Sequence, residues 1–128
     1  MLPVTFDRDT GYFFKAAHEG RLVYRACNAC GQGLPMPTQF CGRCGSEDTG
    51  WHDARGTATL YTWTTVAHSV HPAYPAPYTI VVVALDDAPS VRLVGSLPGA
   101  PDLKAGQAMK VVFQKMSDDT TIPQWVTV

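Results

Sequence analysis

The sequence predicts a mainly β fold with a short N-terminal helix, in which a metal-bound ribbon precedes a small five-stranded barrel. Three observations support this prediction: a helix-like segment confined to the first 20 residues, four cysteines in two close pairs, and five strand-like runs after residue 56. A chain of 128 residues can bury roughly two thirds of the surface that its unfolded form exposes. An apolar core is therefore possible without covalent cross-links, and the cysteines need another explanation.

The helix is expected to start at a cap residue, Asp9 or Thr10, and to run through Glu19, with Gly20 as its terminator. Successive helical residues are turned by about 100°. Three consecutive aromatic residues therefore cannot all face one small core, and at least one must meet another surface. That surface is either a partner or the protein's own sheet. The aromatic residues that we predict as partner or ligand contacts are Tyr12, Phe13 and Phe14.

The cysteines form two CxxC pairs, Cys27 with Cys30 and Cys41 with Cys44, separated by ten residues. Such a turn directs two thiolates at one ion, and a glycine follows each pair, where it relieves the tight turn. Four sulfurs close a tetrahedron and leave no position for water or substrate, so the predicted site is structural. A metal site is favoured over two disulfides or a redox motif. Zn²⁺ is the favoured metal, and iron in a rubredoxin-like site is the alternative. Metal binding can add on the order of 10 kcal/mol to the folding of residues 22–50, which have little aliphatic core.

Five runs rich in Val, Thr, Ile or aromatic residues follow, with turn signals between them. A long connection after the third run fits a Greek-key barrel of the OB type better than a sandwich, which usually needs about seven strands. Alternation along the first run places Tyr61 and Trp63 on one face. An earlier strand is expected at 21–26. The five runs are residues 57–67, 78–85, 90–97, 109–116 and 122–128. The predicted organisation is a docking helix in 1–20, a rubredoxin-like zinc ribbon in 21–55 and an OB-fold barrel in 56–128.

The charge balance disfavours several classes of partner. Ten Lys and Arg against eleven Asp and Glu give a net charge of −1, which offers no long-range attraction to nucleic acid or to an anionic membrane. Between Cys27 and Gly50, Arg43 is the one basic residue, so no phosphate track is present. No run of about 18 apolar residues predicts a membrane span, and the first ten residues do not read as a secretory signal. We therefore expect a cytoplasmic chain.

The remaining candidate residues lie in the proline-rich loop of residues 68–77. Its histidines can act as bases or ligands, but no free cysteine nucleophile remains if all four bind metal, and neither histidine has a carboxylate nearby in sequence. The sequence also lacks the phosphate-loop, dinucleotide-binding, nucleophile-elbow and HExxH motifs. We therefore expect no catalysis by this chain alone. The loop residues predicted to contact a partner or ligand are His68, His71 and Tyr74.

The order of these segments resembles the OB-fold, rubredoxin-like zinc-ribbon family known as domain of unknown function thirty-five. The resemblance rests on Tyr12-Phe13-Phe14 and on residues 22–27 before the double CxxC, and continues through 56–61, 77–86, 103–106, 111–113 and 117–119. Members of this family accompany thiolase-like enzymes, including lipid-transfer thiolases of the sterol-carrier-protein type, in Claisen condensation or retro-aldol cleavage of acyl-CoA. Some accompany enoyl-CoA hydratases in the degradation of steroid side chains.

The resemblance implies that this chain is a non-catalytic subunit of a hetero-oligomer. It would stabilise a thiolase-like partner and help to shape the partner's acyl-CoA site. It also implies that the four cysteines bind metal, while the catalytic residues belong to the partner. Two alternatives remain open. One is a stand-alone acyl-CoA-binding module, for which arginines near the ribbon could reach the CoA phosphates. The other is a single-stranded nucleic-acid-binding protein, in which Tyr61 and Trp63 would stack on bases.

Overall fold

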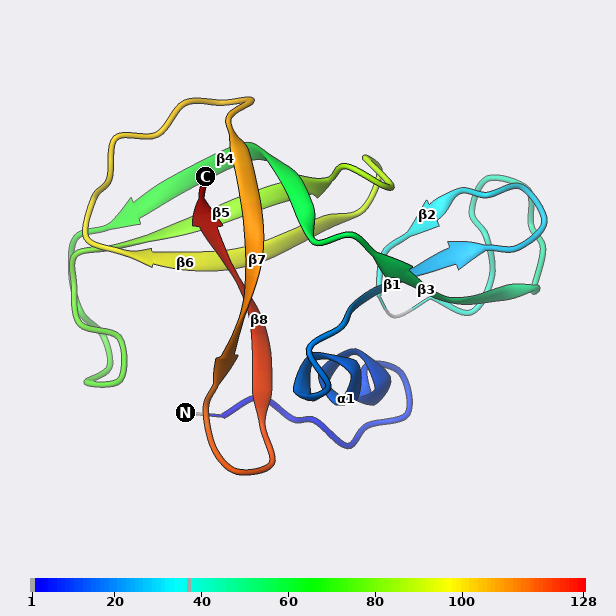
Figure 1. Ribbon diagram of the computed structural model, residues 1–128, viewed down its shortest axis with the longest axis horizontal. Helices are drawn as coiled ribbons and strands as arrows, with labels where there is room; N and C mark the ends of the chain where they lie inside the picture. Colours follow the sequence, from blue (N-terminus) through cyan, green and yellow to red (C-terminus); the bar gives the residue numbers. More distant parts are fainter. Residues whose placement is uncertain (1, 37) are drawn as a thin grey trace.

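The computed structural model of the protein describes residues 2–36 and 38–128. These residues form one helix and eight strands, arranged in a three-stranded and a five-stranded antiparallel sheet, which confirms the mainly β fold class (Figure 1). The smaller sheet has the order β2-β1-β3 and the larger the order β6-β5-β4-β7-β8. The elements are α1 (Gly11–His18), β1 (Leu22–Cys27), β2 (Gly33–Leu34), β3 (Thr49–Ala54), β4 (Thr57–Val66), β5 (Tyr78–Leu85), β6 (Arg92–Pro98), β7 (Ala108–Lys115) and β8 (Thr121–Thr127).

The helix α1 begins and ends with defined backbone contacts. Thr10 is the N-cap residue, but its side chain makes no capping hydrogen bond. Instead, the Asp7 carboxylate accepts hydrogen bonds from the Thr10 backbone N–H at 2.8 Å and from its hydroxyl at 2.7 Å. At the other end Gly20 has a φ of 77°, and the Arg21 N–H donates to the Ala16 carbonyl at 2.9 Å. Gly20 therefore terminates the helix, as expected, and turns the chain into β1.

The ribbon sheet contains the expected strand and two that the sequence did not predict. The run at 21–26 forms β1, which pairs with β3 along its whole length, from Leu22 opposite Ala54 to Cys27 opposite Thr49. The short strand β2 pairs with the other edge of β1. Because β3 has the polar sequence Thr-Gly-Trp-His-Asp-Ala, it carries no apolar alternation and is held by its pairing with β1.

All five predicted barrel strands are present: β5 has the predicted bounds, and the ends of the others differ by at most two residues. Within β4, the pairing passes from Leu60 opposite Val83 to Thr62 opposite Val82, so Tyr61 occupies a β-bulge. An extra residue reverses which face the following side chains occupy. Trp63, which is 37% exposed, therefore lies on the same face as its partner, buried Val81, and the prediction that Tyr61 and Trp63 share a face is wrong.

The barrel closes where its two edge strands, β6 and β8, approach each other. Gly95 lies so close to β8 that a Cβ there would come within 2.7 Å of Gln124 Oε1 and 3.0 Å of Trp125 Cδ1. The Gln124 side chain bridges the seam, since its Oε1 accepts a hydrogen bond from the Ser96 N–H at 2.7 Å. Trp125 is completely buried in the core inside this seam. Side chains therefore complete the barrel where backbone pairing ends.

The ribbon is also tied to the barrel through the residue that links their sheets. Arg55, between β3 and β4, donates its backbone N–H to the Asp87 carboxylate at 2.6 Å, and its guanidinium pairs with the same group. Asp87 lies in the turn between β5 and β6. The domain boundaries at 20/21 and 55/56 stay a prediction. Among the described residues, the structure has no helix with the length and apolar character that a membrane crossing requires.

Candidate metal centre

The two CxxC turns have the same backbone conformation. Gly31 donates its N–H to the Cys27 carbonyl at 2.9 Å, and Gly45 donates to the Cys41 carbonyl at 2.8 Å. The φ angles of these glycines are 81° and 77°, in the left-handed region that a residue with a Cβ rarely adopts. Each CxxC-Gly segment therefore folds into the same knuckle, as its repeated sequence predicts.

The knuckles bring the four thiols into one cluster. Cys27 Sγ lies 3.6 Å from Cys44 Sγ, and Cys30 Sγ lies 3.7 Å from Cys41 Sγ. All four sulfurs lie within 4.8 Å of one another. Four thiolates at about 2.3 Å from a tetrahedral ion would be about 3.8 Å apart. The donor set and its spacing therefore fit a metal ion, and these four residues are the ones that could hold it.

The environment of the thiols differs within each pair. The first cysteine of each pair, Cys27 or Cys41, is buried, whereas Cys30 and Cys44 are exposed. The buried pair packs with Leu34 in a cluster separate from the barrel core. One leucine and two thiols form a very small apolar core, so a bound metal would supply the cohesion that the ribbon lacks.

Backbone groups of the knuckles stabilise the thiolate form of the buried cysteines. Hydrogen bonds from the backbone N–H groups of Cys44 and Arg43 lower the pKa of the Cys41 thiol to about 7. The N–H of Cys30 likewise lowers the pKa of Cys27. At Cys44 the Ser46 N–H acts in the same direction, but the hydrogen bond with Cys27, together with partial loss of solvent around the exposed thiol and contacts with the other two sulfurs, raises its pKa to about 11. The buried thiols are thus prepared to bind a cation as thiolates.

The aromatic residues of α1 contact the protein's own surface. The Tyr12 ring lies 5.4 Å from that of Trp51 in β3, and its hydroxyl accepts a hydrogen bond from Arg21 at 3.2 Å. Phe13 packs against the barrel core and meets Phe14 edge-on at 5.4 Å. The helix thus joins the ribbon to the barrel, and its contact with a partner stays a prediction.

The proline-rich loop brings two of its three predicted contact residues together. The rings of His71 and Tyr74 lie 6.2 Å apart, and Tyr74 lies 6.1 Å from Tyr78 at the start of β5. The Ser69 hydroxyl donates to the Tyr74 carbonyl at 2.6 Å, which closes the loop. His68 is exposed nearby in the chain. A ligand or partner role for these residues stays a prediction.

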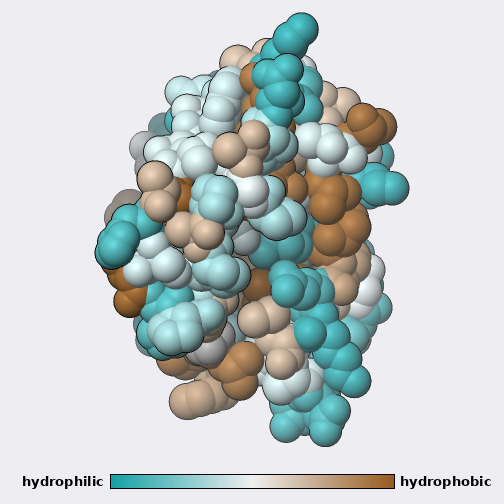
Figure 2. All heavy atoms as spheres, turned by 90° about the vertical axis from the view of Figure 1, so that its left-hand side faces the viewer, coloured by the Kyte–Doolittle hydropathy of each residue, from teal (hydrophilic) through white to brown (hydrophobic). Residues whose placement is uncertain are grey.

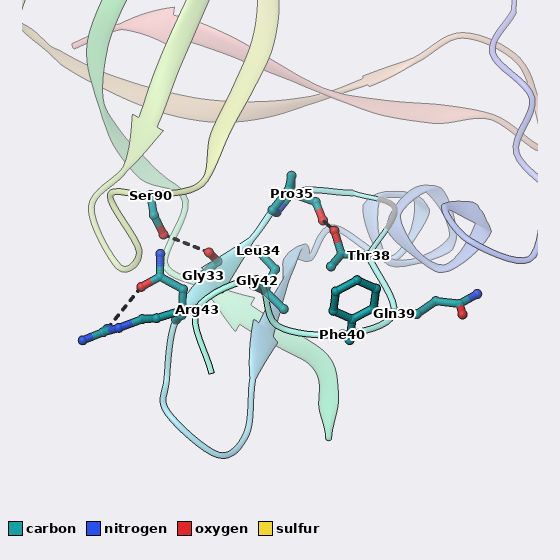
Figure 3. Close-up of a pocket in the computed structure, with 10 residues that line it drawn as sticks. Gly33, Leu34, Pro35, Thr38, Gln39, Phe40, Gly42, Arg43 and Ser90 are labelled. Carbon is teal, nitrogen blue, oxygen red and sulfur yellow. Dashed lines mark hydrogen bonds between the residues drawn. The ribbon is translucent and has the colours of Figure 1, made fainter. Parts of the chain in front are cut away.

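A pocket of about 750 Å³ lies where the ribbon meets the barrel (Figure 3). Its wall includes Leu34 and Phe40 of the ribbon and Ser90 of the barrel. Among the described residues that line it, Arg43 is the one charged side chain, and it donates to Gln32 at 3.3 Å. The sequence did not predict this pocket because it depends on how the two sheets meet.

The barrel and the four-cysteine ribbon together define a zinc-ribbon-like protein of the OB-fold class. The sequence model of the C-terminal OB-fold domain of ChsH2 matches residues 51–114, which is half of the chain. The chain therefore belongs to the DUF35 OB-fold family, as its resemblance predicted.

Similarity to known proteins extends beyond the barrel. The chain is 29% identical to a chain of the solved "Ltp2-ChsH2(DUF35) aldolase", with a TM-score of 0.84 over 98% of both chains. A DUF35 protein from Sulfolobus solfataricus shares the fold, with a TM-score of 0.63 at 16% identity, over 82% of this chain and 78% of that one. The chain is also 34% identical, over 119 residues and 91% of its length, to a probable enoyl-CoA hydratase alpha subunit from Thermomonospora curvata. It spans only 37% of the length of that curated relative.

Proposed function

We propose that this chain is a non-catalytic subunit of a complex with a thiolase-like enzyme that acts on acyl-CoA. One observation carries the proposal: the chain and a chain of the Ltp2-ChsH2(DUF35) aldolase correspond over 98% of both lengths, with a TM-score of 0.84. A match over the full length includes the helix, the ribbon and the barrel. In the proposed complex the thiolase-like subunit supplies the catalytic residues, and this chain stabilises it and helps to shape the acyl-CoA site.

The reaction we propose is carbon–carbon bond formation or cleavage next to a thioester, either Claisen condensation and thiolysis or retro-aldol cleavage. The name of the aldolase supports the retro-aldol direction. The probable enoyl-CoA hydratase alpha subunit supports an acyl-CoA substrate and a hydratase as a further partner. Degradation of a lipid or steroid side chain is the setting that the family resemblance implies.

The four cysteines would hold a structural Zn²⁺ in this subunit. When bound, the ion cross-links the two knuckles and contributes to folding, with no open position for substrate. Cys27, Cys30, Cys41 and Cys44 would hold the ion through their sulfurs. Backbone N–H groups of the knuckles donate hydrogen bonds to the sulfurs of Cys27 and Cys41 and favour their thiolate forms. Such thiolate sites persist in a reducing compartment, which supports the proposed cytoplasmic location.

Co-expression with a thiolase-like relative of Ltp2 from the same organism tests the proposed function. We expect the two proteins to co-purify as a hetero-oligomer, and the enzyme to lose solubility or acyl-CoA turnover when it is expressed alone. The matched control is the same enzyme expressed with an unrelated small β-barrel. A chain that stays monomeric and leaves the enzyme's solubility and turnover unchanged would contradict the proposal.

The alternative of a stand-alone acyl-CoA-binding module has one observation in its favour, the pocket beside the ribbon in Figure 3. Its volume of about 750 Å³ and its single cation, Arg43, suit part of a CoA ester. Calorimetric titration of the isolated chain with acetyl-CoA separates the two functions. Heat of acetyl-CoA binding that disappears in Arg43→Gln would favour the acyl-CoA-binding module.

The β-bulge at Tyr61 removes support from the alternative of nucleic-acid binding, because it turns Trp63 to the other face of β4 and the two rings no longer form one stacking surface.

A further inference from the structure

An uncharged groove of about 610 Å³ lies on the outer side of the β6–β8 seam. The proline-rich loop, the ends of β6, β7 and β8, and the N-terminal segment surround it. None of the described residues that line the groove carries a charge, although 16% of the chain is charged. Its apolar and aromatic wall includes Tyr74, Tyr78, Leu97, Met116, Ile122 and Val126.

A second, smaller cleft of about 320 Å³ continues this groove toward α1. Ile122 lines both, so the groove and the cleft adjoin at this residue of β8. The cleft includes Phe13 and Phe14 of α1 and Val94 of β6, and its described lining also carries no charge. Val94 is 64% exposed. We call the groove and the cleft together the seam surface.

The N-terminal segment beside this surface exposes its apolar side chains and partly buries its polar ones. Leu2, Val4 and Phe6 are exposed, Phe6 by 89%, whereas the alternate residues Thr5 and Asp7 are half-buried. In an extended segment, alternate side chains point to opposite sides. The apolar side therefore faces outward, which is the arrangement of a segment that another surface covers. In Figure 1 the proline-rich loop lies on the left and the N-terminal segment runs from left of centre to pass below α1, and Figure 2 shows patches of hydrophobic side chains on the left-hand side of the molecule.

The lack of charge and the aromatic content of the seam surface indicate which kind of partner it would bind. Depletion of charge together with enrichment in Tyr, Phe, Trp and Met is the signature of the buried centre of a protein–protein interface. An anionic ligand such as CoA would bring phosphates to a surface without a cation, and a charged protein surface would lose its hydration without a counter-charge. The complementary occupant is an uncharged, apolar protein surface.

We propose that the thiolase-like subunit docks on the seam surface and covers Leu2, Val4 and Phe6 of the N-terminal segment. This inference rests on the proposed function and names the interface that the complex would use. A different protein is favoured over a second copy, because the related ChsH2 chain, which corresponds to this one over its whole length, is named in a complex with Ltp2. Met36 of the ribbon segment lines the cleft, whereas the four cysteines and the pocket beside Arg43 lie outside the seam surface.

The test places a charge in the seam surface of the full-length chain. Met116→Glu adds a carboxylate at a side chain that is 36% exposed, and Leu2→Glu does so in the N-terminal segment, where no helix or strand is at risk. The measurement is the dissociation constant for a thiolase-like relative of Ltp2 from the same organism. We expect binding to weaken at least about tenfold in each variant, because the partner would bury an unpaired charge. Met116→Leu should bind within about threefold of the wild type.

The matched control is Tyr61→Glu, since Tyr61 is 51% exposed and lies on β4 outside the seam surface. It should bind like the wild type. If Leu2→Glu and Met116→Glu also bind like the wild type, the seam surface is wrong and the proposed function stands. If the wild-type chain itself does not bind, both proposals fail. If the isolated chain dimerises and Met116→Glu makes it monomeric without weakening the complex, the surface joins two copies and the proposal is overturned.

Discussion

The Ser90 hydroxyl donates a hydrogen bond of 3.0 Å to the carbonyl oxygen of Gly33. Gly33 begins β2 at the edge of the ribbon sheet, and Ser90 lies in the turn between β5 and β6 of the barrel. The two residues also touch sterically, because a Cβ on Gly33 would lie 2.8 Å from Ser90 Oγ and 2.7 Å from Val91 Cγ2. The absence of a side chain at this position therefore lets the ribbon pack directly on the barrel.

Gly33→Ala should separate the ribbon from the barrel. Its Cβ would overlap Val91, which is buried, and Ala88 at 3.1 Å, so neighbouring groups must move. We expect unfolding in urea to show a loss of about 1–3 kcal/mol. Gly42→Ala is the control, since a Cβ there meets no atom within 4 Å. Equal stability of the two variants would contradict the packing seen at Gly33.

Gly95→Ala should strain the barrel seam. The new Cβ would lie 3.0 Å from Cδ1 of Trp125, which is completely buried and cannot move without disturbing the core. It would also push aside Gln124, whose Oε1 accepts the Ser96 N–H. We expect a loss of about 1–3 kcal/mol in the free energy of unfolding, measured by urea titration against Gly42→Ala. A Gly95→Ala chain as stable as that control would show that the seam is loosely packed.

The elements that could be predicted from the sequence are those whose signal is local. The two CxxC-Gly repeats gave the knuckles, because each knuckle is closed by hydrogen bonds within its own five residues. The barrel strands were predicted from their β-branched composition, which marks half-buried pleated surfaces. Gly20 marked the end of α1, because its φ of 77° favours glycine.

The elements that escaped prediction depend on distant partners. The strand β3 is polar and is held by β1, more than 20 residues earlier in the chain. The bulge at Tyr61 arises from the fit of β4 to β5, and the alternation of residues alone does not reveal it. The pocket beside the ribbon and the seam surface each form between elements that only the tertiary fold brings together. A candidate metal site was therefore predictable from the sequence. Phe13, Phe14 and Tyr74 were also predicted as contact residues, but the sequence does not show that they line the proposed seam surface.

Asp87→Asn should remove an acid-sensitive link between ribbon and barrel. The Arg55 backbone N–H, and then its guanidinium, hold the pKa of the Asp87 carboxyl below its ordinary value of 3.8. Because the folded pKa lies below the unfolded one, the link stabilises the fold above the unfolded value and is lost as the pH falls through the folded one. The wild type should therefore melt above Asp87→Asn at pH 7, and the difference should shrink below about pH 4.

The measurement is the thermal midpoint of both chains between pH 7 and pH 3, with Asp119→Asn as the control. Asp119 is exposed in the turn between β7 and β8, so its replacement should leave the wild-type profile unchanged. A difference between the wild type and Asp87→Asn that stays constant with pH would assign the stabilisation to packing instead of to the charge.

Cys27→Ser should abolish metal binding and unfold the ribbon while the barrel remains. Cys27 is buried between Leu34 and Cys41, so its loss removes both a ligand and part of the ribbon's small core. Metal analysis should find one zinc per wild-type chain and less than about a tenth of that in the variant; iron would change the assignment of the metal.

Hydrogen exchange distinguishes the unfolding of the ribbon from that of the whole chain. The knuckle ends of β1 and β3, around Cys27 and Thr49, should lose protection in Cys27→Ser, and in the wild type treated with a strong chelator, because their small apolar cluster holds only Cys27, Leu34 and Cys41. Strand β5 should keep its protection, since Val81 and Val83 are completely buried in the separate barrel core. Phe40→Ala, at a side chain that is 60% exposed beside Cys41, should retain both the metal and the protection. A Cys27→Ser chain with protected β1 would mean that the ribbon folds without its metal.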